Sequence, residues 1–319
     1  MSARGADRPM LLALRALKLG DLLVAVPALR GLRRGFPEHR IVLATSSWLA
    51  PLVELVDAVD ELLPANGLDD PLDLPGRPVD LAVNLHGRGP ESTRLLAETG
   101  PRRLLAHAPD SPEGPQWIEG MQERERWVRL VRAWGASADA ADVGIARPGT
   151  DPAVGEAVVV HVGAFHGARR WPVERFAAVA RAFARGGLPV VVTAGPEERK
   201  RAEAVARAAG LPDAAVLAGR LDLAGFAALI ADARLVVSAD TGAAHLATAY
   251  ARPSVVLFGP ATPEEWGPPD TGRHVVLTDP SVRRGEVFTD EPDPALLAVG
   301  ADDVLAAAED LLARAATRA

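Results

Sequence analysis

The chain lacks cysteine, has only two lysines and carries a net negative charge. Without cysteine among its 319 residues, disulfides, thiolate metal sites and cysteine nucleophiles are excluded. The net charge of -7 argues against nucleic acid as the main partner, because phosphate neutralisation needs a basic face. With 48% hydrophobic and 24% charged residues, the composition is that of a globular protein and not of a disordered one.

Long uncharged apolar runs are also missing. The apolar stretch from Met10 to Leu32 is interrupted by Arg15, Lys18 and Asp21, and a charge near a bilayer centre costs several kcal/mol. No other run reaches the roughly 18 apolar residues needed to span a membrane. The sequence therefore predicts a cytoplasmic protein.

Several catalytic motifs are absent as well. There is no Gly-Lys-Ser/Thr phosphate loop, no Gly-x-Ser-x-Gly elbow and no His-Glu-x-x-His pair. The chain also has no Asp-x-Asp that could hold a nucleotide-bound divalent metal, and no complete Gly-x-Gly-x-x-Gly for a dinucleotide. We therefore expect neither a metal nor a cofactor.

What the sequence does contain is an alternation of short apolar runs with helix-period segments. In the first half we expect strands at 10–14, 41–44 and 80–85, helices at 21–35 and 121–134, and a loop at 66–78. In the second half we expect strands at 157–162, 189–194, 235–238 and 254–258, and helices at 172–186, 196–209, 222–231, 242–251 and 301–316.

Strands that alternate with helices predict parallel βαβ units and doubly wound sheets. At about 150 residues a domain, the length suits two. The stretch from Arg147 to Pro152 is the best linker, so we predict Rossmann-like domains at residues 1–150 and 151–319. Ligands in such sheets bind beyond the carboxyl ends of the strands, which directs attention to the loops there.

The first such loop leads to Asp21. Gly20 permits a tight turn after the first strand, and Asp21 then lies at a helix N-terminus. An aspartate in this position could simply cap the helix. It could also present a carboxylate that accepts a proton during a reaction.

The second loop, at residues 161–172, ends in Arg169 and Arg170 just before Pro172. Cations at a helix N-terminus oppose the macrodipole, so an anion held between them and the backbone amides would explain them, most simply a phosphate. Solvated surface arginines are the alternative, and both stay open.

The third loop, Ser238-Ala-Asp-Thr-Gly-Ala-Ala-His245, follows an apolar run. Thr241 and Gly242 open a helix whose first amides could bind a diphosphate. Asp240 could bind sugar hydroxyls beside it. His245 lies one turn into the helix and by itself would more often be a structural residue. The Pro- and Gly-rich loop at 258–268 fits either a wall of the site or a plain turn.

Together these loops resemble glycosyltransferase family 9, the ADP-heptose:lipopolysaccharide heptosyltransferases. The resemblance covers most of the chain. It is carried by Leu19-Gly-Asp21 within the similar stretch 11–41, by Arg-Arg-Trp-Pro at 169–172, and by Asp-Thr-Gly-x-x-His with a downstream Phe-Gly-Pro within 236–260.

The resemblance implies a GT-B fold, with two Rossmann-like domains facing each other across a cleft. It also implies an inverting, metal-independent enzyme of lipopolysaccharide biosynthesis, whose acceptor binds the N-terminal domain and whose nucleotide sugar binds the C-terminal one. In such an enzyme Asp21 would be the general base. The implied donor-binding residues are Arg169 for phosphate, Thr241 and Gly242 for the diphosphate, Asp240 and His245 for the sugar-phosphate, Glu197 for the ribose and Leu221 for the base. The last helix, at about 301–316, would pack back on the N-terminal domain.

Some features depart from the family or leave room for other functions. Ala164 or Phe165 replaces a Ser or Thr that the family often uses, which puts the donor sugar in question. Arg30, Arg33 and Arg34 could meet a phosphorylated or lipid-linked acceptor at the inner membrane surface, or simply complement a helix C-terminus. The acceptor could be another cell-envelope glycan. A nucleotide-sugar epimerase and a non-catalytic nucleotide-binding protein are the competing functions.

Overall fold

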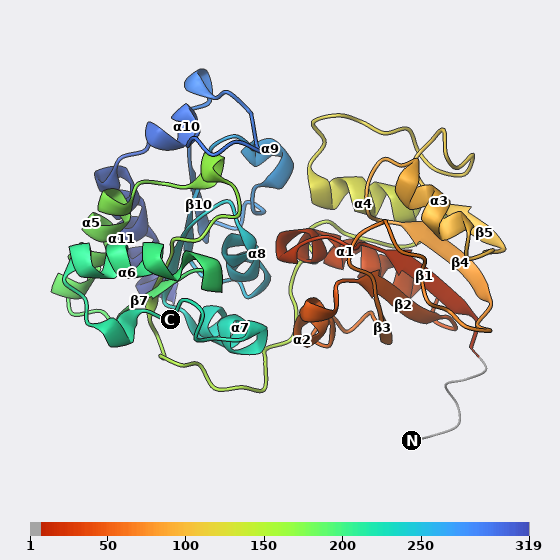
Figure 1. The fold of residues 1–319 in the computed structure, drawn as a ribbon, viewed down its shortest axis with the longest axis horizontal. Coiled ribbons are helices and arrows are strands. Elements are labelled where there is room, and N and C mark those ends of the chain that lie inside the picture. The colour runs from red at the N-terminus through yellow and green to blue at the C-terminus, as the bar shows by residue number, and fades with distance from the viewer. Residues whose placement is uncertain (1–7, 319) are drawn as a thin grey trace. The chain divides into compact units, whose positions relative to one another are not determined.

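The computed structural model describes residues 8–318 and divides into two compact α/β units (Figure 1). Unit 1 ends at Ala146 and unit 2 begins at Arg147. Each unit is described by itself. The cleft expected between the two domains concerns their relative placement and stays a prediction.

The core of unit 1 is a parallel five-stranded sheet with the order β3-β2-β1-β4-β5. Its strands are β1 (Met10–Leu14), β2 (Arg40–Thr45), β3 (Glu61–Pro64), β4 (Val79–Asn84) and β5 (Arg103–Leu105). Every residue of β1 is buried, because helices cover both faces of a central parallel strand. Leu12 and Leu14 belong to one hydrophobic cluster with Leu95 and Leu96 of α3 (Glu91–Ala97), which packs on β4.

On its other side unit 1 carries α1 (Leu19–Gly35) packed beside α4 (Glu123–Arg132), and a short α2 (Ala50–Val53) follows β2. The arginines near the end of α1 are all paired within the unit. Arg30 binds Asp57 at 2.8 Å and Asp142 at 2.6 Å, Arg33 binds Asp60, and Arg34 binds Asp142 at 2.9 Å. Ion pairs with aspartates of the same unit therefore account for these arginines, and both their contact with an acceptor and their effect on the helix C-terminus stay predictions.

Unit 2 has a second parallel sheet with the order β10-β9-β8-β6-β7. Its strands are β6 (Val158–His161), β7 (Val190–Thr193), β8 (Leu235–Ala239), β9 (Ser254–Leu257) and β10 (His274–Leu277). An isolated parallel β-bridge between Val192 and Val216 extends this sheet by one residue pair beyond β7. Including this bridge, unit 2 has the topology of unit 1: the first strand of each unit is central, and the strand order changes direction next to it.

Three helices cover one face of this sheet: α5 (Val173–Arg185), α6 (Arg199–Ala209) and α11 (Ala301–Arg318) share one hydrophobic core with the strands. On the other face α7 (Leu223–Asp232) packs beside α8 (Gly242–Ala249). The short α9 (Pro263–Trp266) and α10 (Pro294–Leu297) lie in the connections after β9 and β10. The last helix contacts α5, β9 and β10 of its own unit, and its expected packing on the N-terminal domain stays a prediction.

The alternation of strands and helices agrees with the parallel α/β class expected from the sequence, and residues 66–78 contain no helix or strand. Sequence periodicity missed the strands β3, β5 and β10 and the helices α2, α3, α9 and α10. Most residues of the missed strands are half-buried or exposed, whereas the four-residue strands β6, β7 and β9, which were expected, are almost wholly buried. Within residues 8–318, no helix is long and apolar enough to cross a membrane.

His107 gives unit 1 a defined pH response. Its buried ring lies 5.0 Å from the ring of Trp117 and 5.9 Å from that of Trp127, and burial lowers its pKa to about 4. The unfolded chain binds this proton with an ordinary pKa near 6.5, so the contribution to stability is complete above about pH 6.5 and is lost as the pH falls towards 4. The free energy of unfolding of the wild-type protein should fall by up to about 3 kcal/mol over this pH range because of His107, and we expect His107→Gln to remove that fall. Denaturant midpoints at pH 4.5 and 7 for both proteins measure it, and parallel profiles would contradict it.

Candidate active site

Strand order sets where each unit can bind a ligand. In unit 1 the chain reverses direction between β1 and β4, and in unit 2 between β6 and β8. Ligands in open parallel sheets bind beyond the carboxyl ends of the strands at these reversals. Asp21 follows β1, Arg169 follows β6 and Asp240 follows β8, so the sequence-predicted residues lie at the switch point of their own unit.

Asp21 is the third residue of α1 and not the cap residue, because the helix begins two residues earlier than predicted. Its Oδ2 accepts a hydrogen bond from the backbone N–H of Lys18 at 3.2 Å, the reciprocal half of a capping box. Its Oδ1 lies 3.3 Å from Arg15 Nη2. The side chain remains 22% exposed, so this anchored carboxylate can still reach solvent or a substrate.

The neighbouring strand β4 brings a second polar turn to the same edge of the sheet. Asn84 donates hydrogen bonds to Ser92 Oγ and Thr93 Oγ1, both at 2.9 Å, and accepts one from the backbone N–H of His86 at 3.0 Å. Burial, followed by the positive charge of Arg15, lowers the pKa of His86 to about 4. The imidazole is therefore neutral at pH 7. Sequence reasoning missed this histidine because no motif marks it.

In unit 2 the turn from β8 into α8 is held by its own side chains. Ser238 Oγ lies 2.8 Å from Thr241 Oγ1, and Thr241 is the N-cap residue of α8. The first amides of a helix have no partner within the helix and point beyond its end. Gly242 occupies the first helical position, so the start of α8 has the form of an anion site.

Three of the predicted donor residues form one cluster, in which Arg169 and His245 both contact Asp240. This carboxylate is only 4% exposed. Its Oδ2 lies 3.3 Å from Arg169 Nη1, and its Oδ1 lies 3.7 Å from His245 Nε2. Arg169 Nη1 also donates to the backbone carbonyl of Asp240 at 3.2 Å. The ion pair fixes Arg169 beside the start of α8, while the arginine side chain stays 27% exposed.

The loop after β6 is tied down by a residue that the sequence did not single out. Glu198 Oε1 accepts a hydrogen bond from the Ala164 N–H at 2.9 Å and lies 3.5 Å from Arg170 Nη2. A side chain on Gly163 would meet Glu198 Oε2 at 2.6 Å, so the glycine makes room for this contact. Both arginines of the loop are thus paired with carboxylates of the protein, a third possibility beside bound phosphate and solvated surface.

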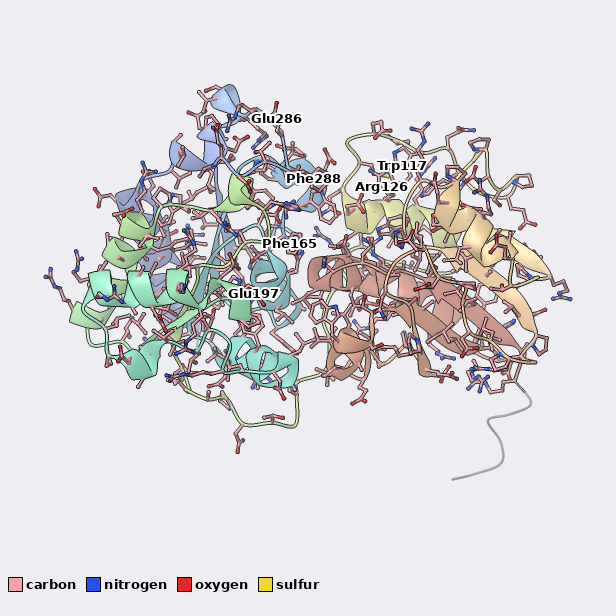
Figure 2. The ribbon with its side chains drawn as sticks, viewed as in Figure 1. Trp117, Arg126, Phe165, Glu197, Glu286 and Phe288 are labelled. Carbon is pink, nitrogen blue, oxygen red and sulfur yellow. The ribbon has the colours of Figure 1, made fainter. Side chains whose placement is uncertain are left out.

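Two weaker candidates stand apart from this cluster. Glu197 lies in the short turn before α6 with its side chain exposed (Figure 2). Leu221 is half-buried in the loop before α7, close to Gly225. Their expected contacts with ribose and base stay predictions. The adjacent Glu198 is the residue that contacts the loop after β6. Because Glu197 and Glu198 are neighbours of the same residue type, the sequence did not indicate which of them makes this contact.

Two exposed aromatic side chains flank the same loop. Phe165 is 77% exposed and Phe288, from the segment after β10, is 83% exposed (Figure 2). The His166 ring lies 4.8 Å from the first and 5.1 Å from the second. Backbone hydrogen bonds from Ala168 N to Thr289 O and from Asp293 N to Ala168 O join the two segments. Phe165 therefore presents an apolar surface on the loop after β6.

Sequence comparison finds heptosyltransferases among the relatives of this chain. Residues 133–284 match the model of glycosyltransferase family 9 (heptosyltransferase). Lipopolysaccharide heptosyltransferase 1 of Pseudomonas aeruginosa is 40% identical over 114 residues, which are 35% of this chain and 31% of that protein. Lipopolysaccharide heptosyltransferase 2 of Salmonella typhimurium is 23% identical over 286 residues, covering 77% of this chain and 81% of that protein.

Solved structures show the same fold. A family 9 glycosyltransferase from Veillonella parvula matches with a TM-score of 0.76 at 20% identity, covering 96% of this chain and 98% of that one. An Escherichia coli heptosyltransferase with ADP-2-deoxy-2-fluoro heptose matches with a TM-score of 0.67 at 19% identity, over 94% and 99% of the two chains. The fold is GT-B, as expected from the sequence. The chain is thus similar to glycosyltransferase family 9 over residues 133–284, and a heptosyltransferase aligns with it across both units at 23% identity.

Proposed function

We propose that this protein is an inverting heptosyltransferase that moves heptose from ADP-heptose to a hydroxyl of a lipopolysaccharide or related cell-envelope acceptor. The observation that carries the proposal is the cluster at the switch point of unit 2, where Arg169, Asp240 and His245 surround the start of α8. A helix N-terminus beside an arginine suits a diphosphate. The names of the relatives, and the ADP-heptose analogue in one related structure, support the choice of donor.

The chemistry follows from placing acceptor and donor at the two switch points. The acceptor oxygen attacks the anomeric carbon of heptose and forms the new glycosidic bond, while the bond from that carbon to the diphosphate oxygen breaks. Asp21 takes the acceptor proton, and ADP leaves with growing negative charge. Arg169 and the first amides of α8 would stabilise that charge, since preorganised donors at developing charge are worth a few kcal/mol each.

We further propose that the transfer needs no divalent metal and takes place at the inner membrane surface, where a lipid-linked acceptor would lie. The chain contains no Asp-x-Asp motif. Among residues 8–318 no group of three His, Asp or Glu side chains is arranged to hold a metal ion. We expect turnover to persist in excess EDTA. Loss of turnover on chelation, restored by Mg²⁺ or Mn²⁺, would contradict metal independence.

The donor is tested by thermal stability in the presence of ADP, UDP, GDP, dTDP and their sugar conjugates. A ligand at 100 times its dissociation constant stabilises a folded protein by about 2.7 kcal/mol, which is readily seen as a shift in Tm. We expect a shift with ADP and ADP-heptose only. A shift with a different nucleotide would change the donor, and no shift with any of them would contradict the donor site.

A further inference from the structure

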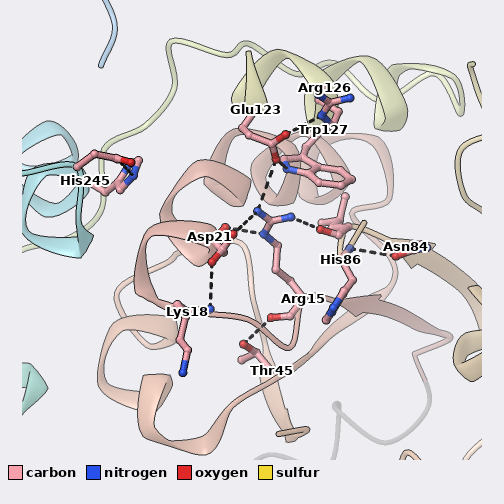
Figure 3. Close-up of polar contacts among 12 residues, drawn as sticks. Arg15, Lys18, Asp21, Thr45, Asn84, His86, Glu123, Arg126, Trp127 and His245 are labelled. Atoms are coloured by element: carbon pink, nitrogen blue, oxygen red, sulfur yellow. Dashed lines mark hydrogen bonds and ion pairs between the residues drawn. The ribbon is translucent and has the colours of Figure 1, made fainter. Parts of the chain in front are cut away.

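Arg15, the residue that follows β1, is a buried cation in contact with Asp21. It is 1% exposed, and its guanidinium contacts four groups (Figure 3). Nε donates to the backbone carbonyl of Asp21 at 2.6 Å, and Nη1 donates to the carbonyl of Leu85. Nη2 lies 3.3 Å from Asp21 Oδ1 and 3.9 Å from Glu123 Oε2. One side chain thereby connects the start of α1 to the end of β4 and to α4.

The second carboxylate near Arg15 is already engaged elsewhere. Glu123, at the start of α4, accepts hydrogen bonds from Arg126 Nε at 2.7 Å and from Trp127 Nε1 at 3.0 Å. The guanidinium of Arg126 in turn stacks on the ring of Trp117 at 3.8 Å. With Glu123 paired to Arg126, Asp21 is the nearer and less occupied counter-charge for Arg15. A buried arginine without a counter-charge is strongly unfavourable, so the two residues hold each other in place.

Packing from α4 fixes the guanidinium itself. Its central carbon lies 4.7 Å from the centre of the Trp127 ring. The backbone of Arg15 is held separately by β2, because Thr45 Oγ1 donates a hydrogen bond to the Arg15 carbonyl at 2.8 Å. The contacts with two backbone carbonyls and a carboxylate use the planar fork of arginine, which a lysine ammonium cannot reproduce.

We propose that Arg15 is a positioning residue: it holds the Asp21 carboxylate in one orientation at the rim of unit 1, and Glu123 and Trp127 of α4 fix Arg15 in turn. This inference rests on the proposed role of Asp21. It extends the reactive site of unit 1 to α4, more than 100 residues along the chain. A displacement of a reacting group by about 1 Å can cost about 10²-fold in rate.

The test compares Arg15→Lys, Arg15→Met, Asp21→Asn and the double variant Arg15→Met/Asp21→Asn. Turnover is measured with ADP-heptose and heptose-deficient lipopolysaccharide, and ADP-induced thermal shifts report the folded donor site. Arg33→Lys is the matched control, because Arg33 also pairs with an aspartate and two backbone carbonyls of unit 1 without touching Asp21. If Arg15→Met does not fold, Arg15→Lys and Glu123→Gln carry the same comparison.

We expect both Arg15 variants to lose about 10- to 100-fold in kcat, with the KM for ADP-heptose and the ADP shift unchanged. In the Asp21→Asn background, Arg15→Met should cause no further loss, because it acts through that carboxylate. Two results would overturn the positioning role alone. One is a kcat of the double variant that falls by the product of the two single losses. The other is an unchanged kcat in Arg15→Lys and Arg15→Met while Asp21→Asn is inactive. Near-normal turnover of Asp21→Asn would overturn the base role and this inference together.

Discussion

Asp21→Asn is expected to lower turnover by about 10²- to 10⁴-fold and to leave ADP binding unchanged, since a general base contributes a factor of this size. Asparagine keeps the size of the side chain and an oxygen that can accept the Lys18 N–H, so the capping interaction at the start of α1 survives. What is lost is the ability to take a proton. Initial rates of ADP release with acceptor, together with the ADP thermal shift, measure the two effects separately.

Asp57→Asn is the matched control for this experiment. Asp57 belongs to the same unit, is 71% exposed and pairs with Arg30 at 2.8 Å, so the same charge is removed beside another arginine. Its turnover should equal that of the wild-type protein. If Asp21→Asn is as active as this control, or if it loses stability without losing turnover, Asp21 is a helix-capping residue and another group must act as the base.

Arg169→Ala is expected to remove most of the affinity for ADP and to lower kcat/KM for ADP-heptose by about 10²- to 10³-fold, the usual cost of one preorganised donor at developing charge. The variant also leaves the buried carboxylate of Asp240 without its arginine, 3.3 Å away in the wild-type protein. An uncompensated negative charge at the start of α8 repels a diphosphate, so both effects act in the same direction. Calorimetric titration with ADP measures the binding term directly.

Arg207→Ala is the comparison here, because Arg207 is an exposed arginine of α6 in the same unit. It should bind ADP as the wild-type protein does. Asp240→Asn combined with Arg169→Ala separates lost attraction from new repulsion, since removing both charges should recover part of the affinity. Unchanged ADP binding by Arg169→Ala would refute the phosphate-binding role of this residue.

The central elements of both units could be predicted from the sequence, because their signals are local. The run of five apolar residues from Met10 marks β1, and the apolar run at Leu235 with the Asp-Thr-Gly turn marks the passage from β8 into α8. Parallel topology then places Asp21, Arg169 and Asp240 at the carboxyl ends of central strands. The position of these three residues in the fold could therefore be predicted from the sequence without knowledge of any side-chain contact.

The partners of these residues could not be predicted in the same way, because they come from distant segments. Arg15 meets Glu123 and Arg169 meets Asp240 only after the strands and helices between them have packed. Glu198 reaches the Ala164 amide across the end of the sheet, and no spacing in the sequence relates the two. The two arginines before a helix were compatible with a bound anion or with a solvated surface, whereas in the folded unit Arg169 pairs with Asp240 and Arg170 with Glu198.

The central claim is tested most directly by incubating the protein with ADP-heptose and heptose-deficient lipopolysaccharide and following ADP release together with the mass of the acceptor. Heptosyl transfer predicts that one heptose is added for each ADP released and that neither change occurs without acceptor. Conversion of the donor in the absence of acceptor would indicate an epimerase instead. Binding of ADP-heptose with no ADP release and no change in any cell-envelope acceptor would contradict a transferase.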